Sequence, residues 1–446
     1  MRGPSNGILS GAYRAVWRWH FYAGLLVLPF LMLMALTGGA YLFKDEIDGL
    51  AYARLAEVAP RAQQAAPDRW VASAQAATGG RVSNLTLPDR RDQAVRMTVD
   101  LADGKKLTAF VDPHDASFKG ATAFGGVMEA IKRLHSLALI GPWANYLVEI
   151  VAGWALVLVA TGLFLWWPRG RGVGVATIKA TDPARRPFWR DLHAVTGVYA
   201  AAVIALLVVT GMPWSAFWGD RFMAYVKDHG LGRPAPPASA PAFAHAEHRD
   251  APADVGWTME GMVMPGHHHH PAARPRVDVA VATAEAQGLA RPYTVSIPAD
   301  PSVALTAARV TRQVEDAHIL YIDGVTGAVQ AEVKYDQYGP GARFFEWGVA
   351  VHQGTQYGWI NRYLMLGGCI AIWLLAISGA IMWWKRRPDG RLAAPVAPPG
   401  PRARAAVLGI VLPLAILYPL TGLSLLAAIG LDRLIALARR ARPAAA

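Results

Sequence analysis

The chain has 446 residues, of which 53% are hydrophobic and only 17% are charged. This composition excludes an ordinary soluble domain and a disordered chain, and it is typical of a membrane protein. The formal net charge is +12, which we assign to lysines and arginines at a membrane lipid surface and not to a nucleic-acid footprint. Cys369 is the only cysteine, so disulfides within this chain are excluded.

Apolar runs long enough to cross the hydrocarbon core as helices occur along the whole chain. In chain order, the predicted transmembrane helices are 16–43, 144–168, 191–218 and 359–385. The first run is too long for a signal peptide and lacks a convincing cleavage site. A further hydrophobic segment, 405–431, contains Pro413 and Pro419. It is predicted to form either one extra C-terminal helix or a hairpin bent at its prolines.

The two long segments between the spans are predicted to contain small α+β modules. The first segment holds a module over 57–120 and an interfacial helix over 125–140. The second holds a Pro- and His-rich loop over 231–275, a module over 276–335 and an interfacial segment over 340–357. Each module begins with a helical pattern such as "DRWVASAQAATGG" and continues with alternating strands such as "AVRMTVDLADG". We expect one helix on a short antiparallel sheet in each module.

Lysines and arginines in the short flanks predict the orientation of the spans. They gather before the first span, in the loop 169–190 and after the fourth span. We therefore expect a bacterial inner-membrane protein with a cytoplasmic N-terminus and periplasmic modules. A single crossing by the segment 405–431 would leave Arg439 and Arg440 outside, against this rule, so the topology of that segment stays open.

The second half of the sequence repeats the first half. The matched positions are His135 and His352, Gly141 and Gly358, Tyr146 and Tyr363, and Trp166-Trp167 and Trp383-Trp384. His20 and His193 are each followed by glycine, threonine and glycine at identical offsets. The pattern predicts a polytopic α-helical membrane protein with a duplicated core of 2+2 transmembrane helices, whose symmetry axis runs along the membrane normal.

The four repeated histidines fall at two predicted depths. His20 and His193 lie at the starts of inward-starting helices, whereas His135 and His352 precede the returning helices. A rise of about 1.5 Å per residue separates the two levels by about 25 Å. Two imidazoles at one level are what a b-type haem needs as axial ligands, and nearby glycines, including Gly24 and Gly197, would let a flat macrocycle approach the helices. Interfacial histidines, a metal site and a proton relay stay open as alternatives.

The motifs "RWHFYAG", "RLHS", "DLHAVTGVY" and "VHQG", with the Trp-Trp-x-Arg span ends and both modules, resemble the PepSY-associated transmembrane family over about residues 13–390. Similar members are inner-membrane reductases that carry haem between helices and reduce ferric siderophores in the periplasm. The resemblance implies two haem b groups per chain, with His20, His135, His193 and His352 as the iron ligands. It also implies that the two α+β modules are PepSY-like.

The expected function is that of a di-haem electron conduit to a periplasmic ferric siderophore or other ferric chelate. No nucleotide-binding fingerprint is visible, so we expect a cytoplasmic reductase or quinol as the donor. One alternative is a membrane-anchored PepSY binding or peptidase-regulating protein without redox activity. Another is a metal or siderophore permease, which is disfavoured because the apolar runs carry no interior Asp, Glu, Lys or Arg.

Several other side chains could bind metal or tune the site. The loop 231–275 contains His245, His248, Met259, Met262, Met264 and His267 to His270. We interpret it as a low-complexity loop, with soft-metal binding as the alternative. His114 and His318 are expected at the surface of the modules. Glu129 and Glu346, six residues before the outer histidines, are expected to be helix charges, with a supporting role beside the metal ligands as the alternative.

Overall fold

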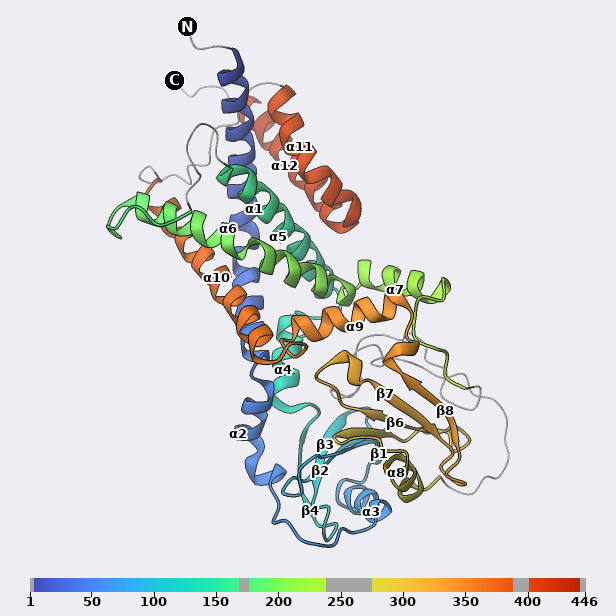
Figure 1. The fold of residues 1–446 in the computed structure, drawn as a ribbon. Helices are drawn as coiled ribbons and strands as arrows, with labels where there is room; N and C mark the ends of the chain where they lie inside the picture. Colours follow the sequence, from blue (N-terminus) through green and yellow to red (C-terminus); the bar gives the residue numbers. More distant parts are fainter. Residues whose placement is uncertain (1–3, 168–175, 238–274, 388–400, 442–446) are drawn as a thin grey trace. The chain divides into compact units, whose positions relative to one another are not determined.

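The computed structural model describes residues 4–167, 176–237, 275–387 and 401–441 of the chain (Figure 1). The chain divides into two compact units. The helical unit comprises Met1–Leu42, Arg133–Ala224 and Trp359–Ala446, and the sheet unit comprises Phe43–Lys132 and Tyr225–Gly358. Each is described separately below.

Within the described residues, four helices are long and apolar enough to cross a membrane. They are α1 (Pro4–Tyr41), α5 (Ala144–Trp166), α6 (Arg186–Gly211) and α10 (Gly358–Trp384). A short 3-10 helix, η1 (Met212–Trp214), continues α6. The expectation of a membrane protein with four spans therefore agrees with the structure, although α6 starts before residue 191. Pro187 in the first turn of α6 favours this earlier start, because proline is pre-organised for the beginning of a helix.

The α1 and α5 helices pack closely along their length. Val16 and Val27 of α1 share a buried apolar cluster with Val157 of α5. Trp19 also stacks on Trp154, with the ring centres 6.5 Å apart and the planes nearly parallel. Large apolar side chains elsewhere on the bundle are exposed, as a lipid-facing surface requires.

The C-terminal hydrophobic segment forms a helical hairpin. The α11 helix (Pro401–Leu417) and the α12 helix (Pro419–Ala441) lie side by side, joined at Tyr418 (Figure 1). Pro419 ends α11 because the residue before a proline is disfavoured in the helical conformation. The apolar parts of the two helices are both shorter than a membrane span. The segment thus has the two-helix form of the hairpin alternative, and the membrane topology of its basic tail stays a prediction.

The hairpin packs against α5 through a close backbone approach. The α12 helix meets α5 at Gly153, where an added Cβ would lie 1.8 Å from Oγ1 and 2.9 Å from Cβ of Thr421. Nearby, Nε1 of Trp154 donates a 2.9 Å hydrogen bond to Oγ of Ser424. The absence of a side chain at Gly153 is therefore a requirement of this packing.

Glu149 contradicts the expectation that the spans carry no interior acidic side chain. The α5 helix begins at Ala144, so Glu149 lies within it, and its side chain has no exposed surface. One carboxylate oxygen accepts hydrogen bonds from the backbone N–H groups of Phe217 and Trp218, at 3.2 and 3.1 Å. These groups begin the α7 helix (Trp218–Asp228). Glu149 thus satisfies backbone donors that a helix start leaves without partners.

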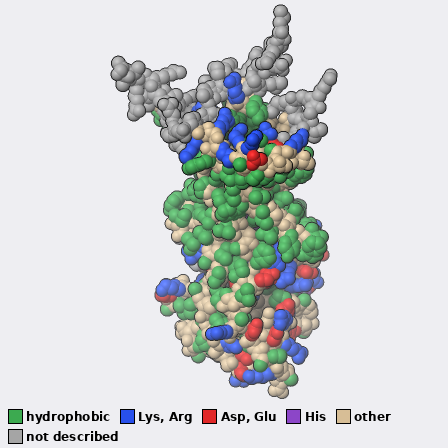
Figure 2. All heavy atoms as spheres, turned by 90° about the vertical axis from the view of Figure 1, so that its left-hand side faces the viewer, with side chains coloured by type: hydrophobic (Ala, Val, Ile, Leu, Met, Phe, Trp, Pro, Cys, Tyr) green, Lys and Arg blue, Asp and Glu red, His purple; other side chains and the backbone are tan. Residues whose placement is uncertain are grey.

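Lysine and arginine side chains gather at one end of the helical unit, beyond a band of hydrophobic side chains (Figure 2). We call this the basic end, and it includes Arg18, Arg186, Arg190, Lys385 and Arg386. The guanidinium of Arg386 lies 4.3 Å from the ring centre of Trp17 on α1. Buried Asp191 accepts hydrogen bonds from the backbone of Lys179 and Ala180, which ties the loop before α6 to that helix.

The sheet unit contains one antiparallel sheet of eight strands, in the order β4-β3-β2-β1-β5-β6-β7-β8. The strands are β1 (Arg81–Leu87), β2 (Val95–Asp100), β3 (Lys106–Val111), β4 (Phe118–Ala123), β5 (Tyr293–Ser296), β6 (Leu305–Arg309), β7 (His318–Ile322) and β8 (Val329–Lys334). The expectation of two separate sheets is wrong, because β1 pairs with β5 and places Leu85 opposite Val295. This pairing satisfies backbone groups that two separate modules would each leave at an open edge.

The helices α3 (Pro67–Thr78) and α8 (Val277–Ala286) pack on this sheet in one continuous apolar core. Their N-termini cap one another. The backbone N–H of Asp68 donates to the Asp278 carboxylate, and the N–H of Val277 donates to the Asp68 carboxylate, both at 2.7 Å. Each aspartate therefore satisfies a donor of the other helix, which couples the two modules.

The remaining helices in the described part of the chain are shorter than the four spans. They are α2 (Lys44–Ala56), α4 (Gly126–His135), α9 (Pro340–His352), η3 (Val314–Asp316) and η4 (Tyr335–Gln337). The α4 and α9 helices occupy the positions at which interfacial segments were expected. They end at His135 and His352, the two histidines predicted for the outer level.

The Gly153 contact predicts a clear effect on stability. Gly153→Ala should lower the resistance of the detergent-solubilised protein to thermal unfolding by about 1–3 kcal/mol, because α12 must move away from α5. Gly430→Ala is the matched control, since nothing lies within 4 Å of its added Cβ, and alanine should leave stability unchanged or raise it. Equal unfolding midpoints for the two variants would contradict the packing described for the hairpin.

Candidate functional site

The structure brings together two of the four predicted site histidines. His20 on α1 and His193 on α6 both belong to the helical unit, and their ring centres lie 6.3 Å apart with the planes at 89°. His135 also belongs to the helical unit, whereas His352 belongs to the sheet unit. The pairing of His135 with His352 therefore stays a prediction from the sequence repeat.

The separation of His20 and His193 suits a shared metal ion. A metal–imidazole bond is about 2.0–2.1 Å and the ring nitrogen lies about 1.1 Å from the ring centre, so two imidazoles on opposite sides of one metal have centres roughly 6.3 Å apart. The observed distance equals this value. Perpendicular ring planes put no constraint on such binding, because each nitrogen lone pair lies in the plane of its own ring.

A hydroxyl group on another helix holds each histidine of the helical unit. Nδ1 of His20 lies 2.8 Å from Oγ1 of Thr161 on α5. Nδ1 of His193 lies 3.0 Å from Oγ of Ser378 on α10. In the same way, Nδ1 of His135 lies 2.9 Å from Oγ1 of Thr37 on α1. Three rings thus use the same nitrogen for the same kind of contact.

A glycine follows each of these hydroxyl residues and lies against the same ring. An added Cβ at Gly162 would lie 3.3 Å from Cε1 of His20, and one at Gly38 would lie 3.3 Å from Cε1 of His135. Gly379 has the same relation to His193 at 3.7 Å. The glycines therefore let the imidazoles approach the helix backbone closely.

The reasoning from sequence noted Thr37 and Thr210 as repeated positions but gave no hydroxyl residue a role beside a histidine. The available signal was a Ser/Thr-Gly dipeptide in each span: Thr37-Gly38, Thr161-Gly162, Thr210-Gly211 and Ser378-Gly379. Gly24 and Gly197, expected near a macrocycle, instead face Leu158 and Leu375 across helix–helix contacts. Glycine spacing alone did not distinguish these two uses.

The donor set fits a haem better than a metal held by protein ligands alone. A structural or catalytic zinc site takes three or four protein ligands. Among the residues that the structure describes, no group of three or more His, Cys, Asp and Glu side chains is placed to hold a metal. Two imidazoles between apolar helices match the axial ligands of a macrocycle that supplies the other four positions.

Burial keeps His135 in the form that a metal ligand requires. Desolvation lowers the pKa of its imidazole below the ordinary value, even though a contact with the Met34 carbonyl acts in the opposite direction. The ring is therefore neutral at pH 7, and neutral imidazole is the form that binds metal.

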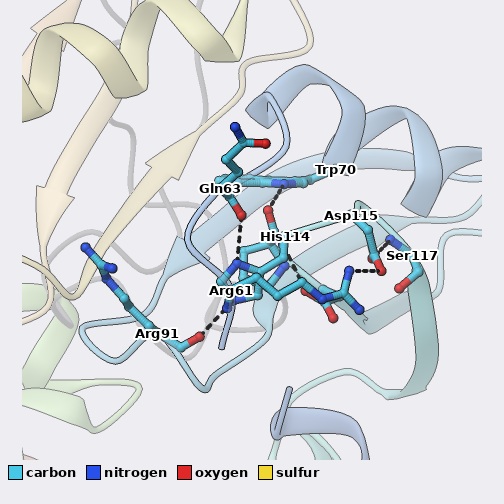
Figure 3. A network of polar contacts seen from close by, with 9 residues as sticks. Arg61, Gln63, Trp70, Arg91, His114, Asp115 and Ser117 are labelled. Carbon is cyan, nitrogen blue, oxygen red and sulfur yellow. Dashed lines mark hydrogen bonds and ion pairs between the residues drawn. The ribbon is translucent and has the colours of Figure 1, made fainter. Parts of the chain in front are cut away.

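His114 is not a surface residue, contrary to expectation. It is 8% exposed, and its Nδ1 and Nε2 each lie 3.0 Å from a backbone carbonyl oxygen, of Gln63 and Arg91 respectively (Figure 3). The adjacent Pro113 carbonyl accepts a 3.1 Å hydrogen bond from Nε1 of buried Trp70. His114 thus joins two loops to the core of the sheet unit, and this structural role explains the side chain without a ligand.

Glu346 also differs from the expectation of a simple helix charge. It lies within α9 and forms a buried ion pair with Arg233, whose guanidinium lies 4.8 Å from the ring centre of Tyr338. Glu129 pairs with Lys132 at 2.8 Å on α4. The histidines and methionines from His245 to His270 lie outside the described residues, so soft-metal binding there stays a prediction.

The family model described as the PepSY-associated TM region matches residues 17–386. The matched range contains all four predicted site histidines and ends before the α11–α12 hairpin. No curated protein matches the sequence.

The network around His114 predicts unequal effects of two histidine substitutions. His114→Ala should destabilise the protein by about 1–3 kcal/mol, because buried polar groups lose their partner. His318→Ala is the control from the same sheet. Its Nε2 lies 2.8 Å from Glu332 at a partly exposed site, and its loss should change stability by less than about 0.5 kcal/mol. Thermal unfolding measures both, and equal effects would contradict the structural role of His114.

Proposed function

The chain belongs to the PepSY-associated transmembrane family, and on this basis we propose that it is an inner-membrane electron conduit. Two b-type haems would pass electrons from the cytoplasmic side, or from quinol, to a ferric chelate in the periplasm. The proposal rests mainly on one observation. The ring centres of His20 and His193 are 6.3 Å apart, which is the separation that a shared metal requires.

The residues of the helical unit are suited to hold one haem at the basic end. His20 and His193 would be the axial ligands, and Arg186 and Arg386 lie close enough to repel one another. Two cations in that position would be stabilised by anionic groups such as haem propionates. A haem with two imidazole ligands supplies one-electron exchange. The apolar side chains of α1, α5, α6 and α10 would exclude water from it.

The second haem is proposed from the sequence repeat, with His135 and His352 as its ligands. The support within the helical unit is that His135 has the same surroundings as His20. Its Nδ1 contacts a threonine hydroxyl, and a glycine lies against its Cε1. Similar surroundings at two levels are expected if both levels carry the same kind of cofactor.

A ferric siderophore or other ferric chelate is the proposed electron acceptor. Reduction to the ferrous ion weakens its binding by hard oxygen ligands, so that one electron releases the iron. The sheet unit would hold the chelate on the periplasmic side, and the basic end would face the cytoplasm, as the positive-inside rule predicts. A cytoplasmic reductase or membrane quinol would supply the electrons.

The two alternative functions keep the membrane helices but need no haem. In a binding or peptidase-regulating protein, the helices would serve as an anchor for the sheet unit. A permease would need polar groups along its path, and Glu149 and Asp191 are buried carboxylates in the described parts of the spans. One oxygen of Glu149 accepts hydrogen bonds from two backbone donors of α7, and Asp191 accepts from the backbone of Lys179 and Ala180, which favours a structural role for both.

The haem content of the purified protein tests the assignment of the four histidines as iron ligands. The purified protein should contain two haems per chain, and the reduced-minus-oxidised spectrum should show split α and β bands. His20→Ala and His193→Ala should each lose one haem and keep the other. His229→Ala, at an exposed site, should keep both. A colourless wild-type protein, or two haems retained in all four single His→Ala variants, would contradict the proposal.

Electron transfer across the membrane tests the activity. Proteoliposomes that contain the protein and an enclosed reductant should reduce an external ferric chelate, with a ferrous-specific dye as the readout. His193→Ala should slow this reduction at least tenfold, because the conduit loses a ligand. Iron release by liposomes without any reductant would instead favour a binding protein or a permease.

A further inference from the structure

We infer that the hydroxyl groups of Thr161, Ser378 and Thr37 are positioning residues that set the tautomer of His20, His193 and His135. Each hydroxyl holds the proton of its histidine on Nδ1, which leaves the lone pair of Nε2 available to bind iron. The role toward iron rests on the proposed function, whereas the tautomer itself depends on the protein alone.

The direction of each hydrogen bond follows from the second contact of the hydroxyl. A serine or threonine hydroxyl has one proton to donate. Oγ1 of Thr161 lies 2.6 Å from the carbonyl oxygen of Val157, one helical turn earlier. A carbonyl oxygen can only accept, so this bond uses the hydroxyl proton. The oxygen must then accept the hydrogen bond from Nδ1 of His20, and Nδ1 must carry the proton.

The same bond recurs at the other two sites. Oγ of Ser378 lies 2.6 Å from the carbonyl oxygen of Leu374, and Oγ1 of Thr37 lies 2.7 Å from that of Leu33. Each hydroxyl again donates its hydrogen bond to a carbonyl one helical turn earlier. His193 and His135 are therefore donors at Nδ1 for the same reason as His20.

A neutral imidazole with its proton on Nδ1 has its lone pair on Nε2. Histidines that bind metal usually donate their other N–H to a carboxylate, a carbonyl or water, which fixes the ring and raises its basicity. Here the acceptor is a hydroxyl, which adds no net charge inside the membrane. A carboxylate in the same position would be costly in hydrocarbon and would push the ring toward the anionic form.

The glycine after each hydroxyl residue leaves room for the imidazole ring in this position. Cε1 lies between the two ring nitrogens, so a side chain pressing on Cε1 would tilt the ring away from both partners. At Gly162 and Gly38 an added Cβ would lie only 3.3 Å from this atom, whereas 3.7 Å at Gly379 is an ordinary contact. Thr210, followed by Gly211, belongs to the same sequence pattern, and its hydroxyl donates to the Leu206 carbonyl at 2.6 Å.

The first experiment uses the full-length protein without haem. Nitrogen-15 labelled histidine, observed by NMR in detergent micelles, distinguishes a proton on Nδ1 from a proton on Nε2. His20, assigned by the signal lost in His20→Ala, should be in the Nδ1–H form. Thr161→Val, which keeps the shape but removes the acceptor, should produce a mixture of tautomers, and Thr161→Ser should restore the single form. An Nε2–H ring in the wild type would overturn the inference.

The second experiment uses the haem-loaded protein. Thr161→Val should weaken haem binding about 10–100-fold, as losing such a partner does at other metal sites. Any haem that remains should have a higher midpoint potential, because a less basic imidazole stabilises the ferric state less. Thr161→Ser should recover both properties. Thr421→Val is the matched control, since this fully buried hydroxyl has no hydrogen-bond partner among the described residues.

The two experiments separate the failure of this inference from the failure of the proposed function. An Nδ1–H ring in a protein that never binds haem would leave the positioning role intact and refute the conduit. A haem protein whose affinity and potential do not change in Thr161→Val would refute the positioning role alone. Gly162→Ala should lower haem content and Gly379→Ala should not, and equal effects would overturn the role given to the glycines.

Discussion

An imidazole inside an apolar helix bundle must satisfy its N–H group without water, and this requirement organises the helical unit. His20, His193 and His135 each find a hydroxyl oxygen on a different helix, at 2.8 to 3.0 Å. Each contact fixes the rotation of two helices relative to one another. The ligand candidates and the packing of α1 with α5, and of α6 with α10, therefore depend on the same hydrogen bonds.

Several carboxylates of the chain satisfy backbone N–H groups at helix starts. Glu149 accepts from the N–H groups that begin α7, and Asp68 and Asp278 cap each other's helices. The pairing of β1 with β5 likewise removes two open sheet edges. None of these contacts needs a ligand. The His20–His193 approach differs from them, because it brings two imidazoles together without a backbone group between them.

A redox function and a structural function place different demands on a histidine. An anchoring residue at a membrane interface can use either ring nitrogen and any rotamer. The described histidines of the helical unit instead use Nδ1 in every case, and two of them converge to 6.3 Å. This uniformity is the reason that the proposed conduit is preferred over an anchor or a permease for a chain of the PepSY-associated family.

The sequence by itself determined the membrane class, the four apolar spans and the strand-rich segments, because hydrophobic length and periodicity are local properties. It also pointed to His20 and His193 through identical offsets in the two halves. The two repeated levels of histidine stay a prediction from the repeat. Only the tertiary structure showed that the two modules share one sheet and that the C-terminal segment forms two helices side by side. It also showed that His114 and Glu149 are buried, and that the hydroxyls of Thr161 and Ser378 hydrogen-bond to the rings of His20 and His193. The joined sheet and the contacts of His114, Glu149, Thr161 and Ser378 depend on residues more than 20 positions apart, which no local pattern encodes.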